Sequence, residues 1–493
     1  MLTLSIVDAD TTDSSNDSFT DEKEAEPSLD YIDHTYNKIA GNNKFYWLIA
    51  FPVGFAYWFG YSRLIPFLIL LPKLTWSFNG GSDWMTCTEV EAWANPQTLY
   101  QIDRSADDTI TNWITELDLV CISKFNLGIF GSLYFVGYVI GALTFVRLGD
   151  TIGRKPVLLF GTTLFWITSV CTYFATNLYL MYFLTLMLGI FEMVRFSLAY
   201  LLMVELLPKE KRNKYYAVCT VTESIICLLI VGYCWKFKDA YHIIIATAVL
   251  SFVHVLSTII TPESPKLLYA NGRIKEMNES LACIASMNGT TFVKDEIISA
   301  NSEDSNKSNN GKTVSFIEAV KEDPVYRKNL FIMAFNWWVC SISCYMTLYY
   351  VGMYPGNLYV NASIIFIGDT ISTYLANTFA GYFGFKRGFS LTFAFVFVTS
   401  VGFEIFNSIP EITYTWVLIM RLGIVLCFDM WYISQSEFFK TNLSSRSFAF
   451  CNVLARILTI LSPIIVTTVP HPILIITVLS LIASITSRYL EKQ

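Results

Sequence analysis

The most informative stretch of the chain reads GALTFVRLGDTIGRK and runs from Gly141 to Lys155. It places Asp150, Arg154 and Lys155 on a short connection between two apolar segments, and Gly153 permits a tight turn there. Charged side chains on such a turn can bind neighbouring helix ends, where helix dipoles and carboxylates lie. We therefore interpret these residues as a conformational loop between two membrane helices. The alternative is an ordinary basic loop on the cytoplasmic side of a membrane.

Apolar segments of this kind continue along most of the chain. Of its 493 residues, 54% are hydrophobic and only 15% are charged, whereas soluble domains carry about 25% charged residues. The apolar blocks are roughly 18 to 28 residues long, which is enough for a helix to cross a bilayer. Lipid cannot hydrogen-bond to the backbone, so these blocks must be helical, and the alternating pattern of a membrane barrel is missing. The sequence predicts an all-α membrane protein.

About twelve transmembrane helices in two six-helix halves are expected. An N-terminal half at 45–261 and a C-terminal half at 328–493 flank a polar linker at 262–327, which we expect in the cytoplasm. Six spans on each side of a divider is the arrangement of transporter halves around a site near the bilayer midplane. The predicted spans are 45–72, 125–148, 156–176, 178–206, 215–235, 239–261, 328–352, 357–384, 389–407, 413–438, 443–468 and 471–488.

Loop charge predicts the orientation of the chain. Lysines and arginines gather in alternate connections, as around Arg154, Arg212 and Arg387. Such connections stay in the cytoplasm, so both termini are expected there, and the opposite side carries a long external loop at 73–124. The segment 1–44 is acidic, rich in Ser and Thr, and free of long apolar runs. We interpret it as a disordered cytoplasmic tail and not as a secretory signal.

Two further motifs flank predicted spans of the N-terminal half. Thr115–Cys121 reads TELDLVC ahead of the second span, and Pro262–Arg273 reads PESPKLLYANGR after the sixth span. With the stretch at 141–155, they resemble segments of the organic cation/anion/zwitterion transporter family of solute carriers, within the major facilitator superfamily. The resemblance covers about residues 45 to 470. It implies the major-facilitator fold and alternating-access movement of small organic ions. It also implies a plasma membrane location, with an intracellular membrane as the alternative.

Several ionisable residues fall inside the predicted spans, where a charge is costly and usually faces a cavity or a partner. In the superfamily, helices one, four, seven and ten line the cavity, so the resemblance places Arg63 and Arg195 within reach of a substrate. Because Glu192 precedes Arg195 by three positions, an internal ion pair is the alternative. Arg421 could equally snorkel to the interface or contact substrate. Asp369 aligns with a family glutamate and is expected to have a gating, structural or binding role. The in-span charges are Arg63, Glu192, Arg195, Glu223, Asp369, Arg421, Asp429 and Arg456.

Arg456 in the eleventh span is the strongest indication of substrate charge. The family resemblance implies that the matching position carries an acid in cation carriers and an arginine in anion and zwitterion carriers. A guanidinium offers a planar pair of donors to a carboxylate, sulfate or phosphate group. Arg456 therefore favours an organic anion or a zwitterion as substrate. The alternative is a structural ion pair of Arg456 with Glu437 or Asp429.

Aromatic residues gather on the spans that are expected to line the cavity. Tyr57 in the first span, and Trp338 and Tyr345 in the seventh, are expected to pack on the organic part of a substrate. Ordinary core packing is the alternative for each of them. The predicted substrate-binding residues are Arg456, Arg195, Arg63, Tyr345, Trp338, Tyr57 and Asp369.

Patterns of other protein classes are missing from the chain. It has no ATPase phosphate loop and no hydrolase nucleophile elbow, and its 4 histidines form no metal-ligand pattern. We therefore expect neither enzyme activity nor a cofactor or metal. The expected partners are a small organic ion and the lipid bilayer, not a nucleic acid. Cys87 and Cys121, in the external loop, could form a disulfide if that side is oxidising.

Two other functions remain open. Val146 and Gly381 stand where the family's two signature loops usually have a glycine and an acid, and Thr185 stands at a common arginine position. These departures motivate a non-transporting structural subunit or receptor, which would have protein partners in a membrane assembly. An organic cation transporter would instead bind its substrate through in-span acids, namely Glu192, Asp369 and Asp429.

Overall fold

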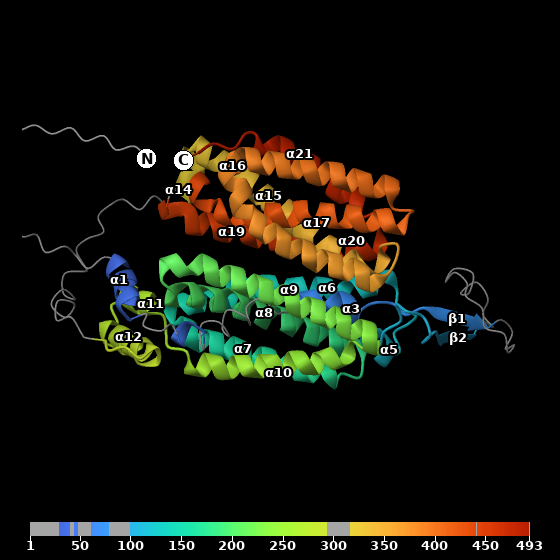
Figure 1. The fold of residues 1–493 in the computed structure, drawn as a ribbon, viewed down its shortest axis with the longest axis horizontal. Coiled ribbons are helices and arrows are strands. Elements are labelled where there is room, and N and C mark those ends of the chain that lie inside the picture. Colours follow the sequence, from blue (N-terminus) through green and yellow to red (C-terminus); the bar gives the residue numbers. More distant parts are fainter. Residues whose placement is uncertain are drawn as a thin grey trace, which may run out of the picture.

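Figure 1 shows two helical bundles lying side by side in the computed structural model, which describes residues 29–39, 44–47, 61–77, 99–292, 316–439 and 441–492. The N-terminal bundle consists of α3 (Tyr61–Leu68), α6 (Lys124–Thr151), α7 (Arg154–Tyr173), α8 (Leu178–Leu206), α9 (Lys209–Phe237) and α10 (Tyr241–Ile260). The C-terminal bundle consists of α15 (Pro324–Tyr349), the short 3-10 helix η2 (Tyr350–Met353), α16 (Leu358–Phe406), α17 (Pro410–Ile433), α18 (Gln435–Phe438), α19 (Thr441–Thr459), α20 (Ser462–Thr468) and α21 (Ile473–Ser487). Each half of the chain thus forms its own bundle.

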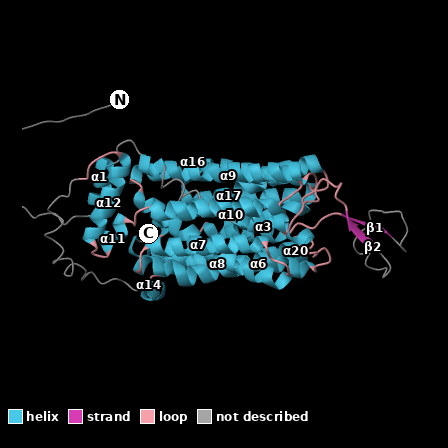
Figure 2. Cartoon of the chain, turned by 90° about the horizontal axis from the view of Figure 1, so that it is seen from below, coloured by secondary structure: helices cyan, strands magenta, loops and turns pink. Residues whose placement is uncertain are grey.

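Short elements cover the two ends of the bundles. One end, which we call the linker end, carries α1 (Leu29–Ile39), α11 (Pro265–Ala270), α12 (Ile274–Asn288) and α14 (Phe316–Glu322). The other, the hairpin end, carries α5 (Trp113–Glu116), β1 (Leu74–Ser77) and β2 (Leu99–Ile102). The two strands pair antiparallel, with Leu74 opposite Ile102. Figure 2 shows this hairpin projecting beyond the helices.

Among the described helices, 8 are long and apolar enough to cross a membrane. Large apolar side chains such as Leu229 and Val249 point outward from the bundles, as contact with lipid requires. The structure confirms an all-helical membrane architecture. Of the predicted first span, 45–72, only 45–47 and 61–72 are described. The long apolar helices are Lys124–Thr151, Arg154–Tyr173, Leu178–Leu206, Tyr241–Ile260, Pro324–Met353, Thr378–Phe406, Pro410–Ile433 and Arg446–Thr468.

Some helix boundaries differ from the predicted ones. The eighth and ninth spans form one element, α16, whose helical backbone is interrupted at Gly384, where φ is 69°. Glycine adopts such positive φ values without a steric cost, so the chain turns there without a loop. The predicted eleventh span is divided into α19 and α20, with Pro463 near the start of α20. The tenth span already ends at Ile433, ahead of the predicted end at 438.

Glycines bring α6 and α8 into close contact inside the N-terminal bundle. A Cβ added to Gly189 would lie 2.0 Å from the carbonyl oxygen of Tyr134, and one added to Gly137 would lie 2.3 Å from that of Leu186. No side chain fits at either position. The two backbones can approach this closely only because both positions are glycine, which is a common means of packing membrane helices.

The two bundles contact each other at the hairpin end. A Cβ added to Gly131 of α6 would lie 2.5 Å from Cγ of Pro463 in α20. Next to it, Ser132 Oγ donates a 2.6 Å hydrogen bond to a backbone carbonyl between α19 and α20. Closer to the hairpin, Tyr359 Oη at the start of α16 donates to the carbonyl of Asp107 at 2.9 Å. These contacts join the halves of the molecule on this side.

Candidate functional site

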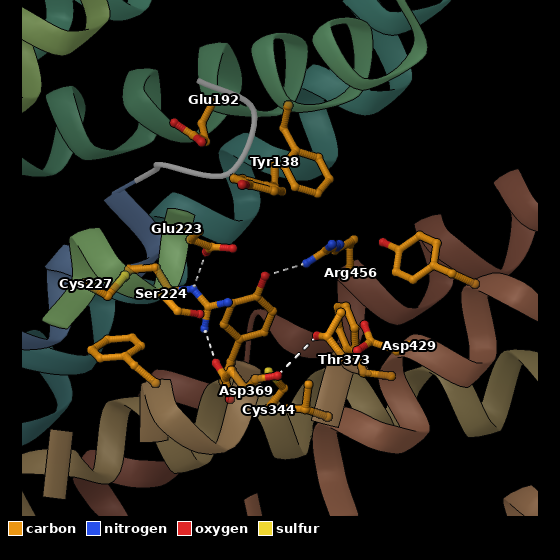
Figure 3. A pocket seen from close by; sticks show the side chains of 17 residues that line it. Tyr138, Glu192, Glu223, Ser224, Cys227, Cys344, Asp369, Thr373, Asp429 and Arg456 are labelled. Carbon is orange, nitrogen blue, oxygen red and sulfur yellow. Dashed lines mark hydrogen bonds and ion pairs between the residues drawn. The ribbon is translucent and has the colours of Figure 1, made fainter. Parts of the chain in front are cut away.

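A cavity of about 80 Å³ lies between the two bundles (Figure 3). Pockets for organic ligands usually measure about 300–1,000 Å³, so a bound organic ion requires this cavity to widen. The N-terminal bundle lines it with Arg63, Tyr138, Glu192, Phe196, Glu223, Ser224 and Cys227. The C-terminal bundle lines it with Cys344, Tyr345, Phe366, Asp369, Thr373, Val425, Phe428, Asp429, Tyr432 and Arg456.

Arg63 joins the two bundles across this cavity. Its Nε donates to Glu223 Oε1 of α9 at 3.2 Å, and its Nη1 donates to Asp369 Oδ2 of α16 at 3.3 Å. Both carboxylates are buried, and both line the cavity. The structure therefore places Arg63 at the cavity, as predicted for a substrate-binding residue, but with its charge balanced by two acids.

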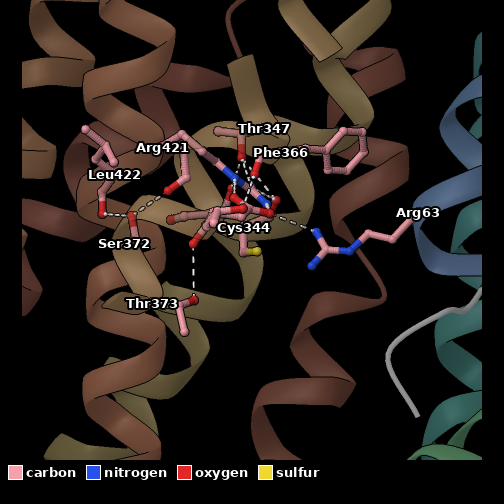
Figure 4. Close-up of polar contacts among 12 residues, drawn as sticks. Arg63, Cys344, Thr347, Phe366, Ser372, Thr373, Arg421 and Leu422 are labelled. Carbon is pink, nitrogen blue, oxygen red and sulfur yellow. Dashed lines mark hydrogen bonds and ion pairs between the residues drawn. The ribbon is translucent and has the colours of Figure 1, made fainter. Parts of the chain in front are cut away.

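Asp369 is also held from within the C-terminal bundle by Arg421 (Figure 4). Arg421 Nε donates to one carboxylate oxygen at 2.5 Å, and its Nη2 donates to the other at 2.9 Å. Its Nη1 donates to the carbonyl of Cys344 at 2.6 Å and to Thr347 Oγ1 at 2.7 Å. Arg421 is 0% exposed. Of the two alternatives for Arg421, snorkelling to the interface is thus wrong, because a two-pronged carboxylate contact satisfies the guanidinium inside the bundle.

Glu192 and Arg195 form the internal ion pair that their spacing on α8 allows. Arg195 Nη2 donates to both carboxylate oxygens of Glu192, at 2.9 and 2.8 Å. The guanidinium also lies 4.2 Å above the centre of the Phe165 ring. Glu192 lines the cavity and Arg195 lies behind it. The structure therefore supports the structural pairing of Arg195, and substrate contact by this residue stays a prediction.

Arg456 lines the cavity and is held by aromatic side chains. Its side chain is 2% exposed, and its Nη1 donates to Tyr345 Oη at 3.0 Å. The guanidinium carbon lies 5.4 Å from the centre of the Tyr138 ring and 5.7 Å from that of Tyr345. Nε has no hydrogen-bond acceptor, and no carboxylate of the described residues lies within 4.0 Å of the guanidinium. The alternative of an ion pair with Glu437 or Asp429 is therefore wrong; Glu437 lies 2.9 Å from the ammonium group of Lys492.

The predicted aromatic residues have different positions. Tyr345 lines the cavity and contacts Phe135 with ring centres 4.6 Å apart. Trp338 does not reach the cavity lining and packs on Phe335 instead. Tyr57 lies outside the described residues. The other aromatic residues that line the cavity are Tyr138, Phe196, Phe366, Phe428 and Tyr432.

One face of α17 forms a large part of the cavity wall. It presents Val425, Phe428, Asp429 and Tyr432, which follow the i, i+3, i+4, i+7 spacing of a single helix face. This spacing is visible in the sequence and could have identified the face. Asp429 is 8% exposed, and its Oδ2 accepts no hydrogen bond from the described residues. No lysine or arginine among them lies within 4.0 Å of this carboxylate.

The predicted conformational loop is assembled at the linker end. Arg154 Nη1 lies 2.8 Å from Glu205 Oε1 near the end of α8, and its Nη2 lies 3.6 Å from Asp150 Oδ1. Arg154 is buried, whereas Asp150 is exposed. The nearer and better buried acid is Glu205, which belongs to another helix. Sequence spacing alone did not identify it as the partner of Arg154.

A second acid holds the other side of the same loop. This acid is Glu263, which follows α10. Its Oε2 accepts a 3.0 Å hydrogen bond from the backbone N–H of Lys155. Gly153 has a φ of 130°, and a Cβ there would lie 2.7 Å from the same carboxylate oxygen. Only glycine therefore fits this turn without strain. Glu263 belongs to the PESP motif, so the two signature motifs of the N-terminal half meet in space.

The disulfide predicted between Cys87 and Cys121 lies partly outside the described residues. Cys121 is exposed, and Cys87 lies outside the described residues, so their pairing stays a prediction. Within the described part of the chain, no three His, Cys, Asp or Glu side chains are arranged to hold a metal ion. The cavity itself is lined mainly by ionic side chains and aromatic rings.

The amino-acid sequence is similar to those of known membrane proteins. Residues 50–463 match the Major Facilitator Superfamily. Solute carrier family 22 member 15 of Xenopus tropicalis is 24% identical over 73% of this chain and 68% of its own length. Solute carrier family 22 member 3 of Mus musculus is 22% identical over 72% of this chain and 64% of its own length. This chain therefore spans about two thirds of the length of these relatives.

Solved structures show the same fold at lower sequence identity. The partially occluded inward-open conformation of the xylose transporter XylE from E. coli covers 90% of this chain and 97% of its own, with a TM-score of 0.61 and 12% identity. At this identity the likeness concerns the fold alone. The family match, the two bundles and the cavity between them agree. This chain is a multi-pass membrane protein that belongs to the major facilitator superfamily.

Proposed function

We propose that this chain carries small organic ions across a membrane, and that Arg456 binds an anionic group of the substrate. The observation that supports this most directly is the position of Arg456, whose buried guanidinium lines the cavity between the bundles and has no carboxylate within 4.0 Å in the part of the chain that the structure describes. An unbalanced charge inside a membrane protein is costly. A carboxylate, sulfate or phosphate group that enters the cavity would balance it through a planar, charge-assisted contact.

The two bundles would move against each other and open the cavity to one side at a time. Because basic loops stay in the cytoplasm, we assign the linker end to that side, together with both termini, the tail 1–44 and the linker 262–327. The loop 73–124 then lies outside, and the contacts of Gly131 and Tyr359 belong to a state closed toward the outside. We assign the protein to the plasma membrane, and we infer no enzymatic activity.

Ionic contacts away from Arg456 would control this movement. The Arg63–Asp369 contact joins the bundles, so we expect it to break when they separate at the hairpin end. Asp150, Arg154 and Lys155 would stabilise one end state through the acids of α8 and of the PESP motif. We expect Asp150, Arg154 and Lys155 to influence the transport rate more than the choice of substrate.

Uptake into proteoliposomes of the purified full-length protein tests the proposal. The labelled compounds are organic anions, zwitterions and cations. We expect saturable uptake of compounds that carry an anionic group, and its loss in Arg456→Ala. Arg456→Lys should retain part of the uptake, because the charge remains and the planar fork is lost. The control is Arg273→Ala, which removes an exposed arginine paired with Glu276 outside the cavity. Unchanged uptake and affinity in well-folded Arg456→Ala would exclude the proposed role.

A non-transporting subunit or receptor is the second candidate function. In the C-terminal counterpart of the conformational loop, Lys386 and Arg387 are exposed and have no carboxylate within 4.0 Å in the described part of the chain. The loop of the N-terminal half, in contrast, is held by two acids. Absence of uptake of any charged compound by well-folded protein, together with a partner that persists through detergent extraction, would favour this function.

A further inference from the structure

The carboxylates of the cavity wall are not all balanced by the protein. Glu192, Glu223, Asp369 and Asp429 line the cavity. An arginine lies within 4.0 Å of each of the first three. Asp429 is more than nine-tenths buried, its Oδ2 accepts no hydrogen bond from the described residues, and none of their lysines or arginines lies within 4.0 Å of it. Asp429 is thus a buried carboxyl group with no cationic partner among the described residues.

The cationic side chains of the same wall divide in the same way. Arg63 is engaged by Glu223 and Asp369, whereas Arg456 has no carboxylate within 4.0 Å among the described residues. Asp429 and Arg456 lie on neighbouring helices of the C-terminal bundle and do not form an ion pair with each other. In Figure 3 both side chains belong to the wall of the same cavity. Among the described residues, the wall of this single cavity therefore carries one arginine and one carboxyl group that have no ionic partner.

The charge of the substrate follows from these two residues. A simple organic anion would balance Arg456 and leave Asp429 buried without a partner. A simple organic cation would do the reverse. A buried charge without a counter-charge is strongly disfavoured. A molecule with both charges is the organic ion that satisfies both side chains at once.

We propose that the substrate is a zwitterion, with its anionic group bound by Arg456 and its ammonium group bound by Asp429. This rests on the proposed transport function and names the charge class that the same cavity accepts. Phe428 and Tyr432 lie on the same face of α17 as Asp429 and also line the cavity. Aromatic faces attract ammonium groups, and quaternary ones in particular. Asp429 together with these rings forms the cation-binding side of the site.

A matched set of small molecules tests this proposal on the purified full-length protein. The zwitterions are ω-trimethylammonium carboxylates of increasing chain length. Each is compared with its tert-butyl isostere, which keeps the shape and the carboxylate but lacks the cation, and with its methyl ester, which keeps only the cation. Equilibrium binding of labelled compounds gives the affinity. For the best chain length we expect the zwitterion to bind at least about tenfold more tightly than either counterpart.

Variants assign the two charges to their residues. Asp429→Asn should remove the advantage of the zwitterion over its tert-butyl isostere, and Arg456→Gln should remove its advantage over the ester. Asp429→Glu should restore part of the first advantage, because it keeps the charge. The control is Glu411→Gln, which removes an exposed carboxylate at the start of the same helix α17 and should leave both advantages intact. If Asp429→Asn fails to fold, the wild-type comparison and Asp429→Glu still decide the outcome.

Distinct results overturn the proposal. Equal binding of the zwitterion and its tert-butyl isostere, with anion binding still dependent on Arg456, would refute the zwitterion and leave the proposed transport function standing. A second result would assign Asp429 to an inorganic cation instead. In that case anions bind as well as zwitterions, their binding needs a proton or Na⁺, and Asp429→Asn removes this need. Absence of binding and uptake for every compound would count against both the zwitterion and the transport function.

Discussion

Asp369 lies between two arginines that come from different bundles. Arg421 contacts both of its carboxylate oxygens from within the C-terminal bundle, and Arg63 reaches it from the N-terminal bundle. If the carboxylate is removed, Arg421 keeps only the neutral acceptors of Cys344 and Thr347, and a single buried charge costs more than a buried pair. Asp369 therefore stabilises two cations, and its contribution is structural before it is functional.

The corresponding prediction concerns protein stability. Asp369→Asn keeps the shape of the side chain and removes its charge, so it should lower the free energy of unfolding by about 3–5 kcal/mol, as for other broken buried pairs. The measurement is the unfolding temperature of the purified protein in detergent. Glu411→Gln, an exposed carboxylate in α17, should leave that temperature unchanged. An equally stable Asp369→Asn variant would show that the Arg421 and Arg63 contacts contribute little.

At the scale of elements, the connection between α6 and α7 is held by residues from elsewhere in the bundle. Arg154 at the start of α7 contacts Glu205 near the end of α8, and the backbone N–H of Lys155 contacts Glu263 after α10. The loop therefore ties α6 and α7 to α8 and to the segment that follows α10. If the linker end is cytoplasmic, these contacts stabilise one arrangement of the helix ends on that side.

Arg154→Ala should therefore change kinetics more than affinity. Loss of the contact with Glu205 removes one stabilising interaction from one end state, so the maximal uptake rate should fall severalfold, while the substrate concentration for half-maximal uptake stays similar. Uptake measured over a range of substrate concentrations separates the two quantities. Arg273→Ala, which removes an exposed arginine near the same end, should retain the wild-type rate. A loss of affinity at constant maximal rate would place Arg154 in substrate binding instead.

At the scale of the whole molecule, the two bundles meet through small residues at the hairpin end. Gly131 leaves room for Pro463, and nearby a Cβ on Gly128 would lie 2.8 Å from Cα of Ile464. A close fit of this kind is sensitive to added volume. We therefore expect the contact between the bundles here to separate the cavity from the hairpin end.

Gly131→Trp should hold the hairpin end open. The indole cannot fit against Pro463, so the bundles should separate on this side, and substrate uptake should fall while the protein still folds. The native thiol of Cys227, which lines the cavity and is 2% exposed, reports the change. Labelling with a membrane-impermeant thiol reagent added outside, read by mass spectrometry of the Cys227 peptide, should increase over wild type. Gly232→Ala, where a Cβ would meet nothing within 4 Å, is the matched control. Unchanged labelling would mean that Gly131 does not control closure.

The sequence by itself determined the helical architecture, the position of the conformational loop and the set of in-span charges. It could do so because lipid imposes helices on long apolar blocks, and because charges are rare enough within them to be noticed individually. It placed Arg63, Asp369, Tyr345 and Arg456 at the cavity. The helical spacing of α17 would also have revealed the face that carries Phe428, Asp429 and Tyr432.

Only the tertiary structure decided which of these charges balance each other. Arg63 and Asp369 are 306 positions apart, and no local pattern connects residues at that separation. The structure also placed Arg421 in the interior and Arg195 behind Glu192, and among the described residues it gives Arg456 and Asp429 no ionic partner. The physical reason is that an ion pair forms wherever folded helices bring opposite charges within a few ångströms. That proximity depends on how the bundles pack, which the order of residues along a single helix does not reveal.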